Sequence, residues 1–553
     1  MNNSIFMFPK PENEPVKCYE FMRSPLKYNN SVSFRILVIA LLSLCFFCSC
    51  AKDRRDDSLD TNAVARKSSG VLLGNHLTNI YATEYMRTLY RQKYNLPPNA
   101  STPVNTTHLY VKLHPDDTTQ FSMIVDDTII NAFPYPLDYE LIGQGQYVQP
   151  AEDSGWVYAV VPVNWSPLSL IHHVLIDSCC IPEKHDEVLV EIENEALLKL
   201  FGSEDEPIPV RSNDGKPRGF IKVQNTSTGQ YDGMRRIKVV MNTLVRVAVT
   251  YTNDNGYYEY NGLPFITKVN YTIMFENIHD FKVWNHHNGF TSILQDAMCL
   301  GKQSRHGYNY KILVSDYNWR AATICNAASV YYNHLWKSSD LNIGRPVGGL
   351  RIGYLPISSS WGACTPMWRH RIYSASEWYQ YLAVYYVTLI GGLAIPDMMV
   401  WSDSWSTDTI YSIIFHELAH VSHYRQVGNT YWNTFVSNTI ANGGYGDGIN
   451  NFNCVGVGEM WAYYAEVKAY DYYKSHYDPI MPNHSAVTSG YWFRPDILQT
   501  LDNYIPEFGI HDIFECMIET NINHCTFRSE ILDRVLVDYQ NIVVNQFGSL
   551  CPN

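Results

Sequence analysis

The sequence H-E-L-A-H at 416–420 lies inside a long apolar stretch with the period of a helix. Apolar residues recur on one face of this stretch: Ile410, Ile413, Ile414, Leu418 and Val421. Two histidines four positions apart lie about 40° apart around a helix axis and one turn apart along it. The imidazoles of His416 and His420 can therefore reach one metal ion, and Glu417 is placed to take a proton from an attacking water. The stretch predicts a helix with one buried apolar face and a second face that can bind a metal ion.

The ends of this helix are marked in the sequence. Residues 406–408 (Ser-Thr-Asp) offer capping oxygens at the start, and Gly428 follows a cationic last turn at the end. The alternative is an ordinary helix with histidines in the core or on the surface. Three histidines and Glu417 share one edge of the helix, which favours a metal site. His423, the third histidine, is either a residue beside the site, an alternative ligand or a solvated side chain.

A third ligand is expected downstream, because catalytic zinc sites usually have three protein ligands. The segment G-V-G-E-M-W-A-Y-Y-A-E at 456–466 predicts a second helix that carries Glu459 near its start, and Glu466 two turns later on the same face. Glu459 is favoured as the ligand, and Glu466 would then orient a histidine N–H. Glu466 as the ligand remains an alternative, as does a row of solvated glutamates beside packed tyrosines.

The helix with H-E-L-A-H and the downstream glutamate resemble the gluzincin branch of the zincin metallopeptidases. The resemblance implies one Zn²⁺ per chain, bound by His416, His420 and Glu459, with Glu417 as general base. It also implies a protein or peptide substrate and an edge strand, at about 396–401, that lines the substrate cleft. Tyr463 stands where the family has an acidic residue, and it is one of two tyrosines, with Tyr464, considered for stabilising the oxyanion. The metzincin branch is disfavoured because position 426 is glutamine.

The N-terminal region has the pattern of a signal peptide. Residues 36–47 are almost entirely apolar, follow basic residues and are too few to span a bilayer. The ending F-C-S-C at 47–50 resembles a bacterial lipobox with Cys50 as the lipidated residue and translation starting at Met22. Cys48 as the lipidated residue and a retained membrane anchor are alternatives. The resemblance implies attachment to the membrane through the N-terminal lipid, in a bacterial outer membrane lipoprotein that faces the periplasm or the cell surface.

The composition is that of a folded protein with room for about three domains. Of the 553 residues 46% are hydrophobic and 17% charged, and a net charge of −13 argues against a nucleic-acid partner. Nine cysteines follow Cys50, an odd number, so at least one stays free or pairs between chains. A disulfide between Cys516 and Cys525 is one hypothesis for the C-terminal region.

The fold class predicted is multidomain α+β. Residues 216–284 contain strand-like runs and the turn T-N-D-N-G-Y-Y, and they resemble the carboxypeptidase-regulatory-like (transthyretin-like) β-sandwich. The mainly helical region that follows would be the zincin-like domain, with a small sheet. The predicted divisions are a signal peptide (1–50), a tether and short helix (51–104), a β-rich module (105–215), the sandwich (216–284) and the metallopeptidase domain (285–553).

Three functions remain open from the sequence. The favoured one is a zinc metallopeptidase that acts outside the cytoplasm. The second is a surface lipoprotein that binds glycan, peptide or host protein through its β modules and carries a non-catalytic zincin-like domain. The third is a zinc hydrolase with a substrate other than a peptide. The intact H-E-L-A-H motif favours an enzyme, because a relic would tolerate the loss of Glu417.

Overall fold

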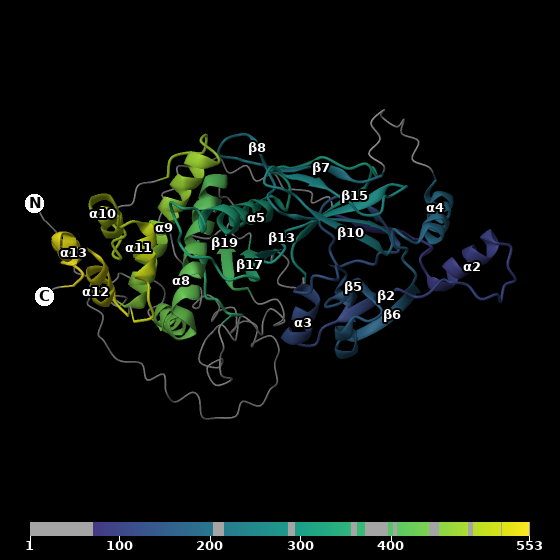
Figure 1. The fold of residues 1–553 in the computed structure, drawn as a ribbon, viewed down its shortest axis with the longest axis horizontal. Coiled ribbons are helices and arrows are strands. Elements are labelled where there is room, and N and C mark those ends of the chain that lie inside the picture. Colours follow the sequence, from purple (N-terminus) through teal and green to yellow (C-terminus); the bar gives the residue numbers. More distant parts are fainter. Residues whose placement is uncertain are drawn as a thin grey trace, which may run out of the picture. The chain divides into compact units, whose positions relative to one another are not determined.

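A computed structural model describes residues 70–202, 215–285, 294–355, 362–370, 396–401, 406–441, 453–484, 490–520 and 522–551. These residues belong to one compact unit. They form ten α-helices and five β-sheets, so the α+β class is confirmed in its coarse form (Figure 1). The predicted signal peptide and Cys50 lie outside the described residues. Within the described part of the chain, no helix combines the length and the apolar character that crossing a bilayer requires.

The first described region is a β-rich module with three helices. Its four-stranded antiparallel sheet has the order β3 (Ala132–Phe133), β5 (Val157–Pro162), β2 (His108–His114), β6 (His172–Cys179). The remaining elements are a two-stranded pair, β1 (Leu72–His76) and β4 (Tyr139–Ile142), and helices α2 (Thr83–Lys93), α3 (Thr118–Val125) and α4 (Glu187–Phe201). Val111 and Leu113 alternate with polar residues on β2 and share a core cluster with Phe121 of α3. This alternation fixes which face of β2 meets the helix.

Two further sheets share one apolar core. One is antiparallel, with the order β10 (Arg246–Tyr251), β9 (Lys238–Thr243), β12 (Val269–Met274), β15 (Ala297–Gln303). The other has the order β11 (Tyr257–Glu259), β7 (Arg218–Gln224), β16 (Tyr310–Ile312), with β8 (Tyr231–Gly233) also paired to β7. Ile221 and Val223 of β7 are buried in the same cluster as Val239 and Met241 of β9. We refer to these two sheets as the paired sheets.

A five-stranded mixed sheet lies next in the chain. Its order is β13 (Glu276–Asn277), β14 (Phe281–Asn285), β17 (Leu350–Leu355), β19 (Met398–Trp401), β18 (Ala363–Cys364). Strands β14, β17 and β19 run parallel, and β18 pairs antiparallel with β19. The strand expected at 396–401 is therefore present, but it is not an edge strand as predicted: β19 has a partner on each side, and its four residues are all buried. Among the described residues, β18 forms that edge.

The chain crosses between sheets around the predicted boundary at 284. Strands β13 and β14, at 276–285, belong to the five-stranded sheet, whereas β15 and β16 return to the paired sheets. Residues on both sides of position 284 therefore complete the same sheets. Sequence alone favoured a boundary here because the strand-like pattern turns helical after 286, and strand order within a sheet leaves no periodic signal.

The C-terminal half is mainly helical. Its helices are α5 (Trp319–Val330), which continues into a π-helical turn (Tyr331–Leu335), α8 (Thr407–Ala441), α9 (Cys454–His476), α10 (Asp496–Tyr504), α11 (Ile510–Glu515), α12 (His524–Arg534) and α13 (Gln540–Phe547). Short 3-10 helices occur at Ala151–Asp153, Ser166–Leu170 and Val537–Tyr539. Helix α8 packs along α9 and against α5 (Figure 1). One continuous core runs from the paired sheets through these helices to the C-terminal region.

The disulfide hypothesis for the C-terminal region is wrong. This region ends in two separate helices, because α12 ends where Val535 adopts an extended conformation (φ −81°, ψ 137°). The disulfide joins Cys525 to Cys551, with 5.3 Å between the Cα atoms. Cys516 is instead buried and forms no disulfide with another described residue. The pairing depends on the return of α13 to α12, which cysteine spacing does not encode.

Candidate metal centre

Helix α8 begins against a turn of the paired sheets. The amide N–H of Thr407 donates to Oγ1 of Thr226 at 2.9 Å, and the amide N–H of Asp408 donates to Oγ of Ser227, also at 2.9 Å. Ser227 in turn donates to the Asp408 carboxylate at 2.7 Å. The caps of the helix thus come from a loop about 180 positions earlier rather than from residues 406–408 alone. This contact fixes the start of the helix that carries the H-E-L-A-H sequence.

The helix breaks where the sequence predicts its end. Gly428 has φ 76° and ψ −174°, so the helical run from Thr407 to Ala441 is two helices joined across this residue. A residue with a side chain rarely adopts such a positive φ, which is why glycine is suited to this position. The histidines of the motif lie on the first of the two helices, and Trp432 and Phe435 lie on the second.

His416, His420 and Glu459 converge from α8 and α9. Nε2 of His420 lies 3.1 Å from Oε1 of Glu459, and Nε2 of His416 lies 3.5 Å from Oε2 of the same carboxylate. All three side chains are buried, and one ligand atom from each lies within 4.8 Å of the others. Although the Glu459 carboxylate is this close, neither Nε2 meets the geometry of a hydrogen bond with it or with another described residue. Two imidazole nitrogens and a carboxylate oxygen thus face one point.

The charges of this group are strongly coupled. Burial alone would lower the pKa of His416, but the Glu459 and Glu466 carboxylates raise it to about 10. Burial also opposes ionisation of Glu459, yet His420 and His416 hold its pKa well below the usual range for a glutamate. The Glu459 carboxylate therefore stays ionised and favours positive charge at His416.

Glu417 is buried beside the group and has a donor of its own. Oγ1 of Thr365 donates to Oε2 of Glu417 at 2.6 Å, and Thr365 follows directly after edge strand β18. The carbonyl of Thr365 accepts from Nε1 of Trp432 at 3.0 Å, which fixes the threonine in place. Burial raises the pKa of Glu417, and the nearby histidines and the Thr365 hydroxyl partly offset this effect. Thr365 was missed in the sequence, where nothing distinguishes it from other threonines.

Glu466 lies at the opposite nitrogen of His416. Its Oε2 is 3.2 Å from Nδ1 of His416, so the same ring meets Glu459 through Nε2 and Glu466 through Nδ1. Oε1 of Glu466 is 3.0 Å from Nε2 of His484 and also accepts from Ser412. The geometry thus places Glu459 toward both histidines and Glu466 behind one of them. His484 was missed because it lies in a loop with no motif around it.

His423 does not join the group of three. Its side chain is completely buried, so the expectation of a solvated histidine is wrong. The ring lies edge-on to Trp432 at 5.5 Å and to Tyr431 at 5.1 Å between centroids. Burial, with a smaller effect of His420, lowers the pKa of His423 to about 3. The aromatic residues that enclose it follow Gly428, so the fold back at this glycine explains the burial.

The two tyrosines considered for the oxyanion differ in position. The ring of Tyr463 lies 6.0 Å from that of His416, and its hydroxyl shares a hydrogen bond of 2.6 Å with the hydroxyl of Tyr491. Tyr464 is buried against Trp461 on another side of α9. Tyr463, paired with Tyr491, is therefore the one that borders the metal-ligand group.

Gly458 has a packing role next to Glu459. A Cβ atom at this position would lie 2.5 Å from Cε2 of Phe435, whose ring packs edge-on to His420 at 5.7 Å between centroids. Phe435 also stacks on Trp432 with centroids 4.6 Å apart. Gly458, which directly precedes Glu459, thus leaves room for the aromatic side chains of Phe435 and Trp432 that enclose His420.

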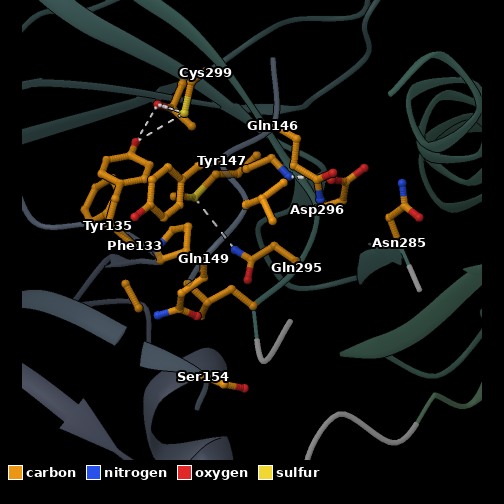
Figure 2. A pocket seen from close by; sticks show the side chains of 17 residues that line it. Phe133, Tyr135, Gln146, Tyr147, Gln149, Ser154, Asn285, Gln295, Asp296 and Cys299 are labelled. Atoms are coloured by element: carbon orange, nitrogen blue, oxygen red, sulfur yellow. Dashed lines mark hydrogen bonds between the residues drawn. The ribbon is translucent and has the colours of Figure 1, made fainter. Parts of the chain in front are cut away.

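A cavity of about 360 Å³ lies away from the metal-ligand group, between the first β-rich module and the paired sheets (Figure 2). Aromatic and amide side chains line it, among them Phe133, Tyr135, Tyr147, Gln146, Gln149 and Gln295. Asp296 borders it and accepts from Nδ2 of Asn318 at 2.8 Å. Burial raises the pKa of Asp296 to about 7. This cavity contains no residue of the H-E-L-A-H helix.

Comparisons with protein families, curated proteins and solved structures found no match to this chain.

Proposed function

We propose that this protein is a zinc-dependent metallopeptidase of gluzincin type. The observation that carries the proposal is the placement of Glu459 between the Nε2 atoms of His416 and His420, at 3.5 and 3.1 Å. Two imidazoles and one carboxylate form a donor set that zinc takes in catalytic sites. The two buried Nε2 atoms, without hydrogen-bond partners in the described part of the chain, fit a metal ligand role better than a structural one.

The surrounding residues support catalysis rather than a purely structural metal site. Zinc bound here would supply a Lewis acid that polarises a carbonyl and lowers the pKa of water. Glu417 would take a proton from the attacking water and return it to the leaving amine. Thr365 holds one oxygen of Glu417, which leaves the other free for the proton. Glu466 holds Nδ1 of His416 and so directs Nε2 toward Glu459.

The five-stranded sheet favours a peptide as substrate. Edge strand β18 runs antiparallel to β19 and leads directly to Thr365, which contacts Glu417. An extended peptide can pair with such an edge through its backbone, next to the residue that acts on it. We infer that peptide binding along β18 would bring a scissile bond toward Glu417. A hydrolase with another substrate has no such use for this edge.

The signal-peptide pattern of the N-terminal sequence supports an activity outside the cytoplasm. We propose that the protein is an outer membrane lipoprotein, anchored through a lipid at Cys50, and that it faces the periplasm or the cell surface. The zincin-like catalytic domain would be one of several domains in the chain. The paired sheets would then correspond to the transthyretin-like sandwich expected at 216–284, extended by β15 and β16. Such a module would act as a spacer or a binding surface.

Metal content and cleavage of peptides test the proposal together. The full-length chain, purified in detergent, is expected to contain about one zinc per molecule and to cleave members of an unbiased peptide library. The Glu417→Gln variant should keep its zinc and lose cleavage, whereas Glu459→Ala should lose zinc. Asp471→Asn, an exposed acid on the same helix α9, serves as the control.

Each other outcome has a defined meaning. Full zinc in Glu459→Ala would move the third ligand to Glu466 or His423. Cleavage that is unchanged in Glu417→Gln would refute the mechanism. Zinc binding without any cleavage in the parent would favour the surface-binding lipoprotein, for which the cavity of about 360 Å³ in the β-rich half is the specific support.

A further inference from the structure

A second cluster of metal-binding side chains lies on the first β-rich module, remote in sequence from α8 and α9. It consists of His114, Asp116 and His172, and one ligand atom from each lies within 4.8 Å of the others. His114 is the last residue of β2, His172 is the first of β6, and the two are direct partners in the antiparallel ladder. Facing residues in such a ladder have Cβ atoms about 5 Å apart, so two imidazoles can meet one ion.

The third member is held by the turn into α3. Oδ1 of Asp116 lies 3.3 Å from Nδ1 of His114. The backbone N–H of Asp116 donates to Oε1 of Gln120 at 2.9 Å, which holds the loop against the helix. Asp117 caps α3 by accepting from the N–H groups of Thr119 and Gln120. The carboxylate of Asp117 therefore already compensates the partial positive charge at the start of this helix.

An aromatic side chain holds both imidazoles. Trp156 packs against His114 at 5.0 Å and against His172 at 5.2 Å between ring centroids. Gly155 lies against the other ring nitrogen of His114: a Cβ there would be 3.0 Å from Nε2. Nδ1 is therefore the nitrogen that His114 presents to Asp116. The nearby cation Lys112, which lies over Trp156, is paired with Asp153, so its charge is balanced.

We propose that His114, Asp116 and His172 form a second binding site for a divalent transition metal of the zinc class. Two imidazoles and one carboxylate suit zinc and copper rather than calcium or magnesium, which prefer all-oxygen sites. The side chains are partly or fully exposed, so water completes the coordination and exchange with solvent is rapid. A metal bound here joins the ends of β2 and β6 and the start of α3, and it stabilises this end of the sheet.

The test is a zinc titration of the full-length chain by calorimetry, after one equivalent of zinc has been added. A second, weaker equivalent is expected. Its affinity should fall at least about tenfold in His114→Ala and in His172→Ala. His185→Ala is the matched control: His185 is an exposed histidine with Glu183 at 3.5 Å and Asp186 at 3.7 Å, and it lies outside the cluster. Its loss should change nothing.

Copper gives a second readout that does not depend on enzymatic activity. In the His420→Ala background, where the first centre is removed, Cu²⁺ bound at this site should show coupling to two imidazole nitrogens by electron paramagnetic resonance, and to one when either His114 or His172 is also replaced by alanine. The proposal is overturned if no second equivalent binds, or if both histidine variants bind it as the parent does. His420→Ala separates the two sites: it should remove the first equivalent alone, so failure of the proposed catalytic centre would leave this result intact.

Discussion

Thr365 donates a hydrogen bond of 2.6 Å to Oε2 of Glu417 and thereby joins the edge of the five-stranded sheet to the H-E-L-A-H helix. The two residues are 52 positions apart. The carbonyl of Thr365 also accepts a hydrogen bond from Trp432 in the second half of α8. The end of strand β18 and both halves of α8 therefore fix the orientation of the Glu417 carboxylate. The position of this carboxylate is therefore a property of the tertiary fold and not of the helix alone.

Replacement of Thr365 by valine should keep the shape of the side chain and remove the donor. A hydrogen bond to a charged group contributes about 1.5–3 kcal/mol, so kcat/KM for a cleaved peptide should fall roughly 10- to 100-fold. The zinc content should stay unchanged, because Thr365 is not among the three ligand residues. Thr365→Ser restores the hydroxyl and should recover most of the activity. Equal activity in the valine variant would show that Glu417 needs no such support.

Glu466→Gln should weaken zinc binding without abolishing it. The variant loses the negative charge that holds Nδ1 of His416, and loss of such a supporting group typically costs 10- to 100-fold in metal affinity. Competition with a chelator of known affinity measures the change. Asp471→Asn on the same helix should bind zinc as the parent does. A complete loss of zinc in Glu466→Gln, with zinc retained in Glu459→Ala, would reverse the assigned roles of the two glutamates.

Asp296 should make the stability of the chain depend on pH between about 4 and 7. Burial keeps this carboxyl protonated up to a pKa of about 7 in the folded state, whereas an exposed aspartate loses its proton near 4. The folded state therefore binds an extra proton in this window. The free energy of unfolding falls as pH rises through it, by up to about 4 kcal/mol from this group.

Urea unfolding at pH 5 and pH 8 measures this dependence. Asp296→Asn should flatten it, because asparagine cannot lose a proton, and the exposed Asp340→Asn should leave it as in the parent. If Asp296→Asn keeps the full slope, the carboxyl is not the source of the dependence and water must reach it in the folded protein.

The disulfide between Cys525 and Cys551 should stabilise the C-terminal helices. It closes a loop with a sequence separation of 26, for which the loss of chain entropy in the unfolded state corresponds to about 3–4 kcal/mol. Peptide mapping without reduction should find these two cysteines linked and Cys516 available for alkylation after unfolding. Cys525→Ser should lower the unfolding temperature. A link from Cys516 to Cys525 would contradict the structure.

The parts of the site that sequence could predict are those with local signals. The period of apolar residues and the glycine at 428 predicted the helix and its break, because both depend on neighbouring residues. The spacing of Glu459 and Glu466 predicted that they share one helical face, and the structure brings both to His416. Helix α9 begins at Cys454, however, so Glu459 lies in its second turn rather than at its start.

The parts that could not be predicted depend on contacts between distant segments. His484 reaches Ser412 across 72 positions, and Thr365 follows a strand of only two residues, too short to show a period. The burial of His423 depends on the second half of α8 folding back, which the position of Gly428 permits but does not specify. The cluster of His114, Asp116 and His172 depends on the register between β2 and β6. The spacing of these three residues in the sequence therefore does not predict it.

The order in which the chain visits its sheets has a consequence for how this protein can be divided. Strands β13 and β14 leave the paired sheets for the five-stranded sheet, and β15 and β16 then complete the paired sheets. A cut anywhere from 276 to 312 would separate strands from at least one sheet. Neither half would therefore carry all the strands of its own sheets, and the two halves cannot be exchanged between proteins as independent structural units.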